Sequence, residues 1–353
     1  MSKVSRKYII NLLLILGLTG FALWFALKDD YVQVLEVLAN VSIIGIIAII
    51  LFSLAYNLLI GCILTLLARQ YKADYKLSQG IVNAFVGSFF SGITPSASGG
   101  QFGQVYVFKK QGINMSDAAS LLWLDFVVYQ TVLMLYAAIL MLLKFGYYYA
   151  HYSFLFGLIF IGFLINFSVI GALWTMAKFP KIYVKLSRHV VALLYKMKIV
   201  KDKEKTLDTW GKQLANFTIE INRNRNNKPL IIKIVLINIL RLTVFFSLPY
   251  LIGLMMHVPA SDMPLLDVIA LSSFVTMSNS FFPVPGASGG TEMMFVQIFS
   301  ILISSKFASS IMIIWRFATY HLVLLIGGLL FILVKQKSKK LVQDTENNEE
   351  GII

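Results

Sequence analysis

The sequence has few charged residues and a single cysteine. Only 14% of its 353 residues are Asp, Glu, Lys or Arg, and 58% are hydrophobic, whereas soluble domains carry about a quarter charged residues. This composition excludes a soluble fold. Cys62 on its own cannot form an intrachain disulfide or a cysteine-rich zinc site, so we expect it to be a small packing residue. The sequence has no HExxH or CxxC motif and no Ser-His-Asp order, so we expect no catalytic residue, metal or cofactor.

Acidic residues are scarce as well. Seventeen Asp and Glu stand against 31 Lys and Arg, which gives a formal net charge of +14. Almost all of the basic residues lie between long apolar runs, so the excess charge belongs to loops and not to a nucleic-acid-binding surface. The expected partners are membrane lipids, including anionic lipids, with a second copy of the chain as a further candidate. Nucleic acid is not expected.

Long apolar runs dominate the chain, whose mean hydropathy is +0.76. A membrane span needs about 20 mainly apolar residues, and six runs qualify: 8–27, 41–67, 118–143, 153–177, 230–256 and 309–334. The first has no cleavage site after it and is predicted to be a retained span. Two more runs, 77–108 and 265–303, are broken by Gly, Pro and Ser, and we expect each to form a re-entrant hairpin. The predicted fold class is an all-α polytopic membrane protein with six full spans and two re-entrant helical hairpins.

The distribution of basic residues predicts the orientation. With the N-terminus inside, 25 of the 31 Lys and Arg fall in cytoplasmic segments and 3 in outer loops. Because basic loops stay on the cytoplasmic side, both termini are predicted to be cytoplasmic. The most basic segment, 178–229, has two amphipathic patterns and is predicted to form a cytoplasmic helical hairpin on an anionic leaflet, with a solvated basic linker as the alternative. Four tyrosines between spans are expected to form an interfacial aromatic belt: Tyr147, Tyr148, Tyr149 and Tyr152.

An internal repeat organises the sequence. Segment 52–56 resembles 246–250, segment 95–100 resembles 285–290, and the pattern of Asp125 and Tyr129 returns at Arg316 and Tyr320, all at offsets of 190 to 194 residues. The repeat unit is span, hairpin, span, and the predicted orientation gives the two units opposite topology, as in alternating-access transporters. The predicted organisation is 1–40 (first span and outer loop), 41–143 (repeat 1), 144–177 (linking span), 178–229 (basic hairpin), 230–334 (inverted repeat 2) and 335–353 (cytoplasmic tail).

The broken hairpins and the buried charges are the candidate substrate site. Irregular backbone at membrane depth has to line a polar cavity, and half-helix N-termini there suit a phosphate or carboxylate. Asp125 and Arg316 occupy equivalent repeat positions and are predicted to face each other, either as a structural ion pair or as a substrate contact. The full set of candidate residues is Thr94, Pro95, Ser96, Ser98, Gly99, Gly100, Gln101, Asp125, Arg241, Pro285, Ser288, Gly289, Gly290, Thr291, Glu292, Arg316 and Tyr320.

Residues 5–335 resemble the flippase-like membrane domain of lysylphosphatidylglycerol synthase and multiple-peptide-resistance-factor proteins. The most specific matches are segments 94–101, 109–112 and 283–292. The resemblance implies a bacterial cytoplasmic membrane protein that moves a phospholipid, an aminoacylated lipid or a related anionic amphiphile between leaflets, with cationic-peptide resistance as the setting. Bifunctional members continue into a soluble aminoacyl-transferase domain, whereas only 19 residues follow the last span here, so lysyl transfer to phosphatidylglycerol is the less favoured alternative. Translocation of polyprenyl-phosphate-linked sugars and a non-transporting scaffold are the others.

Overall fold

The computed structural model describes residues 41–179 except Ser96 and Ser98, residues 227–279, Phe282 and residues 285–350, with isolated residues at 39 and between 185 and 208. The predicted first span, 8–27, and most of the predicted basic hairpin, 178–229, lie outside the described residues. Within the described residues the chain is helical, apart from turns and one isolated β-bridge.

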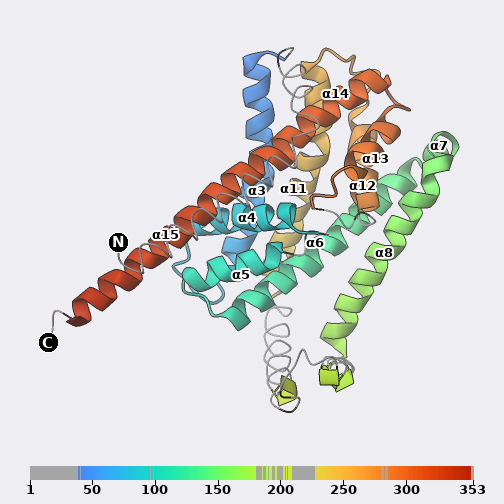
Figure 1. Ribbon diagram of the computed structural model, residues 1–353. Coiled ribbons are helices and arrows are strands. Elements are labelled where there is room, and N and C mark those ends of the chain that lie inside the picture. The colour runs from blue at the N-terminus through green and yellow to red at the C-terminus, as the bar shows by residue number, and fades with distance from the viewer. Residues whose placement is uncertain are drawn as a thin grey trace.

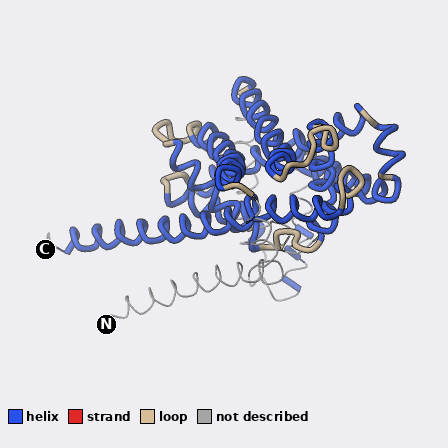
Figure 2. The backbone as a smooth tube through the Cα atoms, turned by 90° about the horizontal axis from the view of Figure 1, so that it is seen from above, coloured by secondary structure: helices blue, strands red, loops and turns tan. Residues whose placement is uncertain are grey.

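The described chain forms two similar series of helices joined by a linking pair. The first series consists of α3 (Ile43–Ala68), α4 (Leu77–Ile93), α5 (Gly100–Lys110) and α6 (Met115–Leu143). The linking pair is α7 (Phe145–His151) and α8 (Ser153–Lys178). The second series consists of α11 (Lys228–Met255), α12 (Leu265–Ser278), α13 (Gly290–Phe299), α14 (Ser305–Arg316), the π-helix η2 (Phe317–His321) and α15 (Leu322–Glu350). In Figures 1 and 2 the end of α15 extends beyond the bundle.

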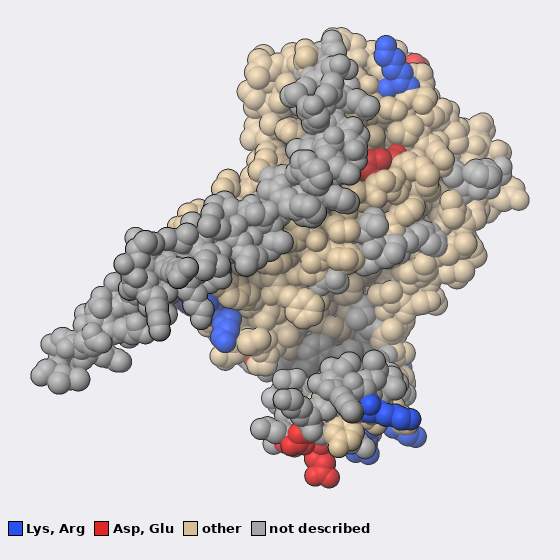
Figure 3. All heavy atoms as spheres, viewed as in Figure 1, with Lys and Arg blue, Asp and Glu red and all other residues tan. Residues whose placement is uncertain are grey.

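Four described helices are long and apolar enough to cross a membrane: α3, α6, α11 and the continuous helix Ser305–Gln336 formed by α14, η2 and α15. The charged side chains visible in Figure 3 lie mainly toward the top and bottom of that face, with a largely uncharged surface between them. The chain is therefore an all-α, multi-pass membrane protein. The total of six spans and the re-entrant course of the hairpins remain predictions.

Helix boundaries recur between the two series. The first residues of α4 and α12 differ by 188, and those of α5 and α13 and of α6 and α14 each differ by 190. Pro95 and Pro285, also 190 apart, form the antiparallel β-bridge. In an arrangement with two-fold symmetry, only residues near the axis contact their own equivalents. The bridge therefore joins equivalent positions in the turns of the two broken hairpins, and α5 and α13 lie toward opposite ends of the molecule (Figure 1).

Small residues let the first hairpin pack closely on its neighbours. A Cβ on Gly80 would lie 2.4 Å from the Gly61 carbonyl oxygen of α3, and a Cβ on Gly327 of α15 would lie 2.3 Å from the Phe85 carbonyl oxygen of α4. Close backbone approach of this kind is how helices associate in a bilayer, where apolar burial from water is not available as a driving force. As a result α4 lies directly between α3 and α15.

A charged cluster, the Asp267 brace, joins the link after α6 to the first turn of α12. Lys144 Nζ lies 2.8 Å from both Asp267 carboxylate oxygens, and the Tyr148 hydroxyl donates to Asp267 Oδ1 over 2.8 Å. Burial, reinforced by the Asp267 carboxylate, raises the pKa of Tyr148, so its hydroxyl remains a donor at neutral pH. The prediction of an aromatic belt is wrong for Tyr148 and Tyr152, which are only 1% and 2% exposed. Tyr148 packs inward because Asp267 supplies a polar partner inside the protein, and the Tyr152 ring packs against the Tyr148 ring.

A neutral cluster, the Gln111 brace, lies at the corresponding turn of the first series. Gln111 Oε1 accepts a hydrogen bond from the buried Tyr75 hydroxyl, and Gln111 Nε2 donates to the Gln79 carbonyl oxygen over 3.0 Å. Lys72 Nζ donates to the Gln111 carbonyl oxygen over 3.0 Å, and Gly112 follows with φ of 89°. The motif at 109–112 therefore ties the end of α5 to the α3–α4 turn.

Candidate functional site

The turn of the second hairpin is held in a left-handed conformation. Gly286, Ala287 and Gly289 have φ of 61°, 49° and 82°. The Thr291 hydroxyl lies 3.1 Å from the Asn279 side-chain oxygen and 3.0 Å from the Ala287 carbonyl oxygen, which ties the start of α13 to the end of α12. A positive φ raises the backbone energy of a residue other than glycine, such as Ala287. The hydrogen bonds of Thr291 therefore have to stabilise the turn in this conformation.

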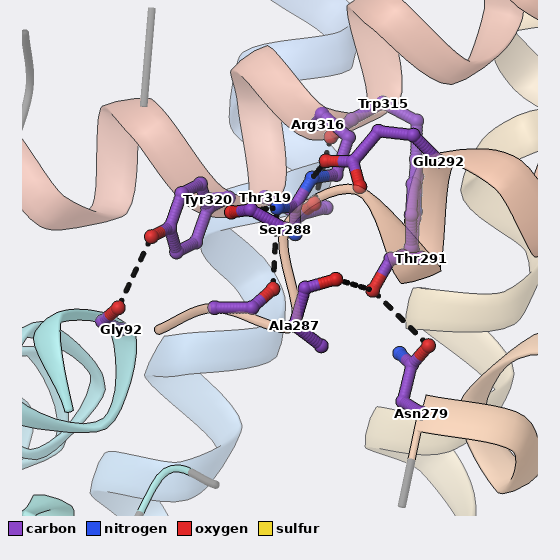
Figure 4. Close-up of polar contacts among 11 residues, drawn as sticks. Gly92, Asn279, Ala287, Ser288, Thr291, Glu292, Trp315, Arg316, Thr319 and Tyr320 are labelled. Carbon is purple, nitrogen blue, oxygen red and sulfur yellow. Dashed lines mark hydrogen bonds and ion pairs between the residues drawn. The ribbon is translucent and has the colours of Figure 1, made fainter. Parts of the chain in front are cut away.

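Arg316, at the end of α14, lies against this turn (Figure 4). Its Nε is 2.6 Å from Glu292 Oε1, and its Nη2 donates to the Gly286 carbonyl oxygen and to Ser288 Oγ, each over 3.2 Å. The Arg316 and Glu292 side chains are 9% and 21% exposed. The contact with Glu292 is an ion pair that lacks the alignment of a hydrogen bond, and the second carboxylate oxygen, Oε2, is buried without a partner.

Tyr320 connects the Arg316 site to the first hairpin. Its ring lies 4.2 Å from the Arg316 guanidinium carbon, and its hydroxyl donates to the Gly92 carbonyl oxygen over 3.0 Å. A Cβ on Gly286 would lie 2.4 Å from the Tyr320 ring, and one on Gly92 would lie 3.1 Å from it. The ring thus fits between glycines of both hairpins. The π-helix η2 begins directly after Arg316 and contains Tyr320, and such turns occur frequently at functional sites.

A second charged cluster lies where α3 and α6 of the first series meet α11 of the second. The Arg241 side chain on α11 is buried, with its guanidinium carbon 4.1 Å from the Tyr129 ring and 5.7 Å from the Tyr56 ring. Arg241 is the cation whose charge acts on Asp125 of α6. Asp125 Oδ1 and Arg241 Nε are buried without hydrogen-bond partners.

The predicted pairing of Asp125 with Arg316 is wrong. Among the described residues, Arg316 forms its ion pair with Glu292, and Asp125 interacts with Arg241. The physical reason is that other helices bring charged groups to each residue. Glu292 of α13 approaches Arg316, and Arg241 of α11 acts on Asp125.

A cavity of about 70 Å³ lies between the two clusters. Tyr56 of the Arg241 cluster and Tyr320 of the Arg316 site both line it, and four more polar side chains contribute to its wall. Its lining residues are Ser53, Tyr56, Asn57, Ser88, Phe245, Thr319, Tyr320, Val323 and Leu324. A polar cavity of this size accommodates a few water molecules.

The predicted residues of the first hairpin occupy a different environment from those of the second. Thr94 Oγ1 donates to the Phe90 carbonyl oxygen over 2.6 Å and accepts from the Gly99 N–H over 2.8 Å, which closes the turn. Gly100 packs against Ser91, where a Cβ would lie 2.0 Å from the hydroxyl oxygen. Gln101 is exposed and lies outside the Arg316 site. Ser96 and Ser98 lie outside the described residues.

Several polar residues that the structure places in this region were not identified from the sequence. Asn57 and Ser88 are hydrogen-bonded at 2.8 Å in the cavity wall, Ser53 donates to the Ala318 carbonyl oxygen over 2.8 Å, and Gly92 accepts from Tyr320. Polar residues inside apolar runs were the available signal for Ser53, Asn57 and Ser88. Asp267 was missed as well, although it lies within the apolar run 265–303.

A profile of the family described as "Lysylphosphatidylglycerol synthase TM region" matches residues 8–327. The match covers most of the chain, including both hairpins and both arginine clusters. The chain belongs to this family. The comparison with curated proteins gave no match. Membership in the lysylphosphatidylglycerol synthase membrane-region family agrees with the helical, multi-pass architecture and with the resemblance seen in the hairpin motifs.

Proposed function

We propose that this chain is a flippase that moves a lipid with an anionic phosphate group between leaflets. The observation that supports this most directly is Arg316, a cation held at the turn of a broken hairpin between long apolar helices. A charged side chain at membrane depth costs at least about 2.5–3.5 kcal/mol on insertion scales, so it is retained where it has a function. The guanidinium fork suits a phosphate, and Ser288 and Tyr320 provide hydroxyl groups beside it.

The headgroup would pass between the two hairpins while the acyl chains remain in lipid. Candidate headgroup contacts are Ser96, Ser98 and Gln101 from the first hairpin, and Ser288, Thr291 and Glu292 from the second. The cavity beside Tyr320 is also lined by Tyr56 of the Arg241 cluster, and Arg241 offers a second cation of the same kind. In this proposal the two opposed halves give access to the two leaflets in turn.

The test is lipid exchange between leaflets in vesicles that contain the purified chain. Nitrobenzoxadiazole-labelled phosphatidylglycerol in phosphatidylcholine vesicles should become fully accessible to dithionite, whereas protein-free vesicles should protect the inner leaflet. Protection equal to that of empty vesicles would contradict the proposal. Excess unlabelled polyprenyl-phosphate sugar should leave the rate unchanged, and strong competition would instead favour that substrate.

A parallel reaction separates lipid movement from lipid synthesis. The same vesicles receive lysyl-tRNA, and the lipids are extracted and analysed by mass spectrometry. We expect no lysylated lipid. A tRNA-dependent product would assign the chain to phosphatidylglycerol lysyl transfer.

A further inference from the structure

The Arg316–Glu292 pair is the only ion pair that the described residues place at the turn of either hairpin. Arg316 has one anionic partner, Glu292 Oε1, and its other contacts, to Gly286 and Ser288, are neutral. An anionic phosphate that binds the guanidinium group has to compete with this carboxylate. A phosphate at Arg316 would therefore occupy the position that the Glu292 carboxylate holds in the empty site.

Charge balance decides what happens to Glu292 when a phosphate binds. If Glu292 stayed ionised, the site would hold two anions and one cation in a region of low dielectric, with one carboxylate unpaired. An unpaired buried charge is so unfavourable that an ionisable group takes up or releases a proton instead. Glu292 Oε2 is already buried without a hydrogen-bond partner, so no other described group compensates its charge.

We propose that Glu292 is a proton-binding site, and that binding of an anionic phosphate to Arg316 is coupled to uptake of one proton by the displaced Glu292 carboxylate. In the empty state the Glu292 carboxylate neutralises Arg316; in the loaded state the phosphate oxygen does so and Glu292 is a neutral carboxylic acid. The net charge of the site is the same in both states. A proton gradient would then drive net movement of the lipid. This inference rests on the proposed function and adds its coupling ion.

The neighbours of Glu292 allow this exchange. The charged and titratable groups that face it are Arg316 and Tyr320, both on the continuous helix Ser305–Gln336. Of the other charged groups on α12 and α14, which pack on α13, Asp267 is held by Lys144 at the far end of α12 and Lys306 is exposed at the start of α14. Glu292 is 21% exposed, so a proton can reach it from the surface.

Coupling of one proton to one anion sets the expected pH dependence. The apparent Kd should rise about tenfold for each unit of increasing pH over the range where the empty site is ionised and the loaded site is protonated. A site that binds phosphate without proton uptake would keep the same Kd across this range. The size of the pH effect therefore distinguishes coupling from simple anion binding.

The experiment is calorimetric titration of the full chain in phosphatidylcholine nanodiscs with dihexanoyl phosphatidylglycerol. Runs at pH 6, 7 and 8 in two buffers with different ionisation enthalpies give both Kd and the number of protons taken up. We expect about one proton per bound anion. A flat Kd with no proton uptake would overturn the proposal, and this result from the unmodified chain requires no variant to fold.

Glu292→Gln gives the sharper test because it removes the competing carboxylate. We expect this variant to bind dihexanoyl phosphatidylglycerol more tightly than the unmodified chain at pH 8, without proton uptake, and to show impaired flipping. A merely structural Glu292 would give weaker binding at every pH. Asp262→Asn is the control, since Asp262 is an exposed acid in the α11–α12 turn, and its proton uptake should equal that of the unmodified chain.

Two further outcomes separate this inference from the function on which it rests. Dithionite-detected flipping with a pH-independent Kd would retain the flippase and overturn the proton site. Glycerophosphoglycerol, which has the same headgroup but no acyl chains, should bind more weakly than the lipid with the same proton uptake. Equal binding of the two, with no flipping, would assign the proton-coupled site to a free phosphate ester and contradict the proposed function alone.

Discussion

In the first half of the molecule the long helix α6 carries Asp125 and Tyr129, whereas the equivalent helix of the second half carries Arg316 and Tyr320. Both tyrosine rings lie about 4 Å from a guanidinium carbon, at 4.1 Å for Arg241 and 4.2 Å for Arg316. The two halves differ in which helix supplies the oppositely charged group. The acid that pairs with Arg316 comes from the second hairpin, while the cation whose charge acts on Asp125 comes from α11.

The hairpins differ in the same way. Glu292 in α13 has Phe102 as its equivalent in α5, and Phe102 is 78% exposed. In the first half the neutral Thr94 closes the hairpin turn, and the neutral Gln111 ties the end of α5 to the α3–α4 turn. In the second half the charged Arg316 contacts the hairpin turn, and the charged Asp267 holds the start of α12. A shared helical framework therefore carries charge mainly in one half, and this asymmetry is what the proposed transport site would use.

The largest effect is expected from breaking the ion pair of the second half. Arg316→Gln leaves Glu292 without its cation and should lower the free energy of unfolding by about 3–5 kcal/mol, as for other buried pairs that lose one partner. Unfolding in mixed dodecyl maltoside and SDS micelles measures this. The double variant Arg316→Gln with Glu292→Gln should recover much of the loss. Equal losses in the single and double variants would contradict the pairing.

The next effect concerns two glycines in one turn. Gly286→Ala adds left-handed strain and overlaps the Tyr320 ring, so it should cost about 2–4 kcal/mol. Gly289→Ala meets nothing within 4 Å of its Cβ, so its cost is backbone strain alone, about 1–3 kcal/mol. The same unfolding measurement compares the variants, and equal costs would argue against the close Tyr320 contact.

The two braces should respond differently to salt. Asp267→Ala and Gln111→Ala each leave a buried tyrosine hydroxyl without its acceptor, so each should cost about 1–3 kcal/mol. Salt should reduce only the cost of Asp267→Ala, because Lys144 is partly exposed. Burial raises the pKa of both Tyr75 and Tyr148, so both braces are stable at neutral pH and weaken as pH rises above about 10. Unfolding at low and high salt tests the contrast.

The smallest effect should be the same in both halves. Ala97 and Ala287 have φ of 54° and 49°, and each should be stabilised by replacement with glycine. The relief of left-handed strain exceeds the added entropy of the unfolded chain by roughly 0.5–1 kcal/mol. Thermal unfolding of Ala97→Gly and Ala287→Gly should give matching increases in Tm. A gain in only one half would show that the two turns are not equivalent.

The sequence predicted the parts of the fold that depend on local signals. Helix-breaking residues divided the run 77–108 at the turn that separates α4 from α5, and the motif containing Pro95 matched the one containing Pro285. It did not predict which charges meet. Asp125 and Arg316 are equivalent in the repeat, but the partner of each depends on how α13 and α11 approach them. The burial of Tyr148 depends in the same way on Asp267, 119 residues away.

The most direct test of the account is the side of the membrane on which equivalent loops lie. Asp74, between α3 and α4, and Ser261, between α11 and α12, are both exposed and 187 residues apart. In a Cys62→Ser background, a membrane-impermeant maleimide should label Ser261→Cys in intact cells and should label Asp74→Cys only after permeabilisation. Labelling of both from the same side would contradict the opposed halves, and with them the proposed transport path.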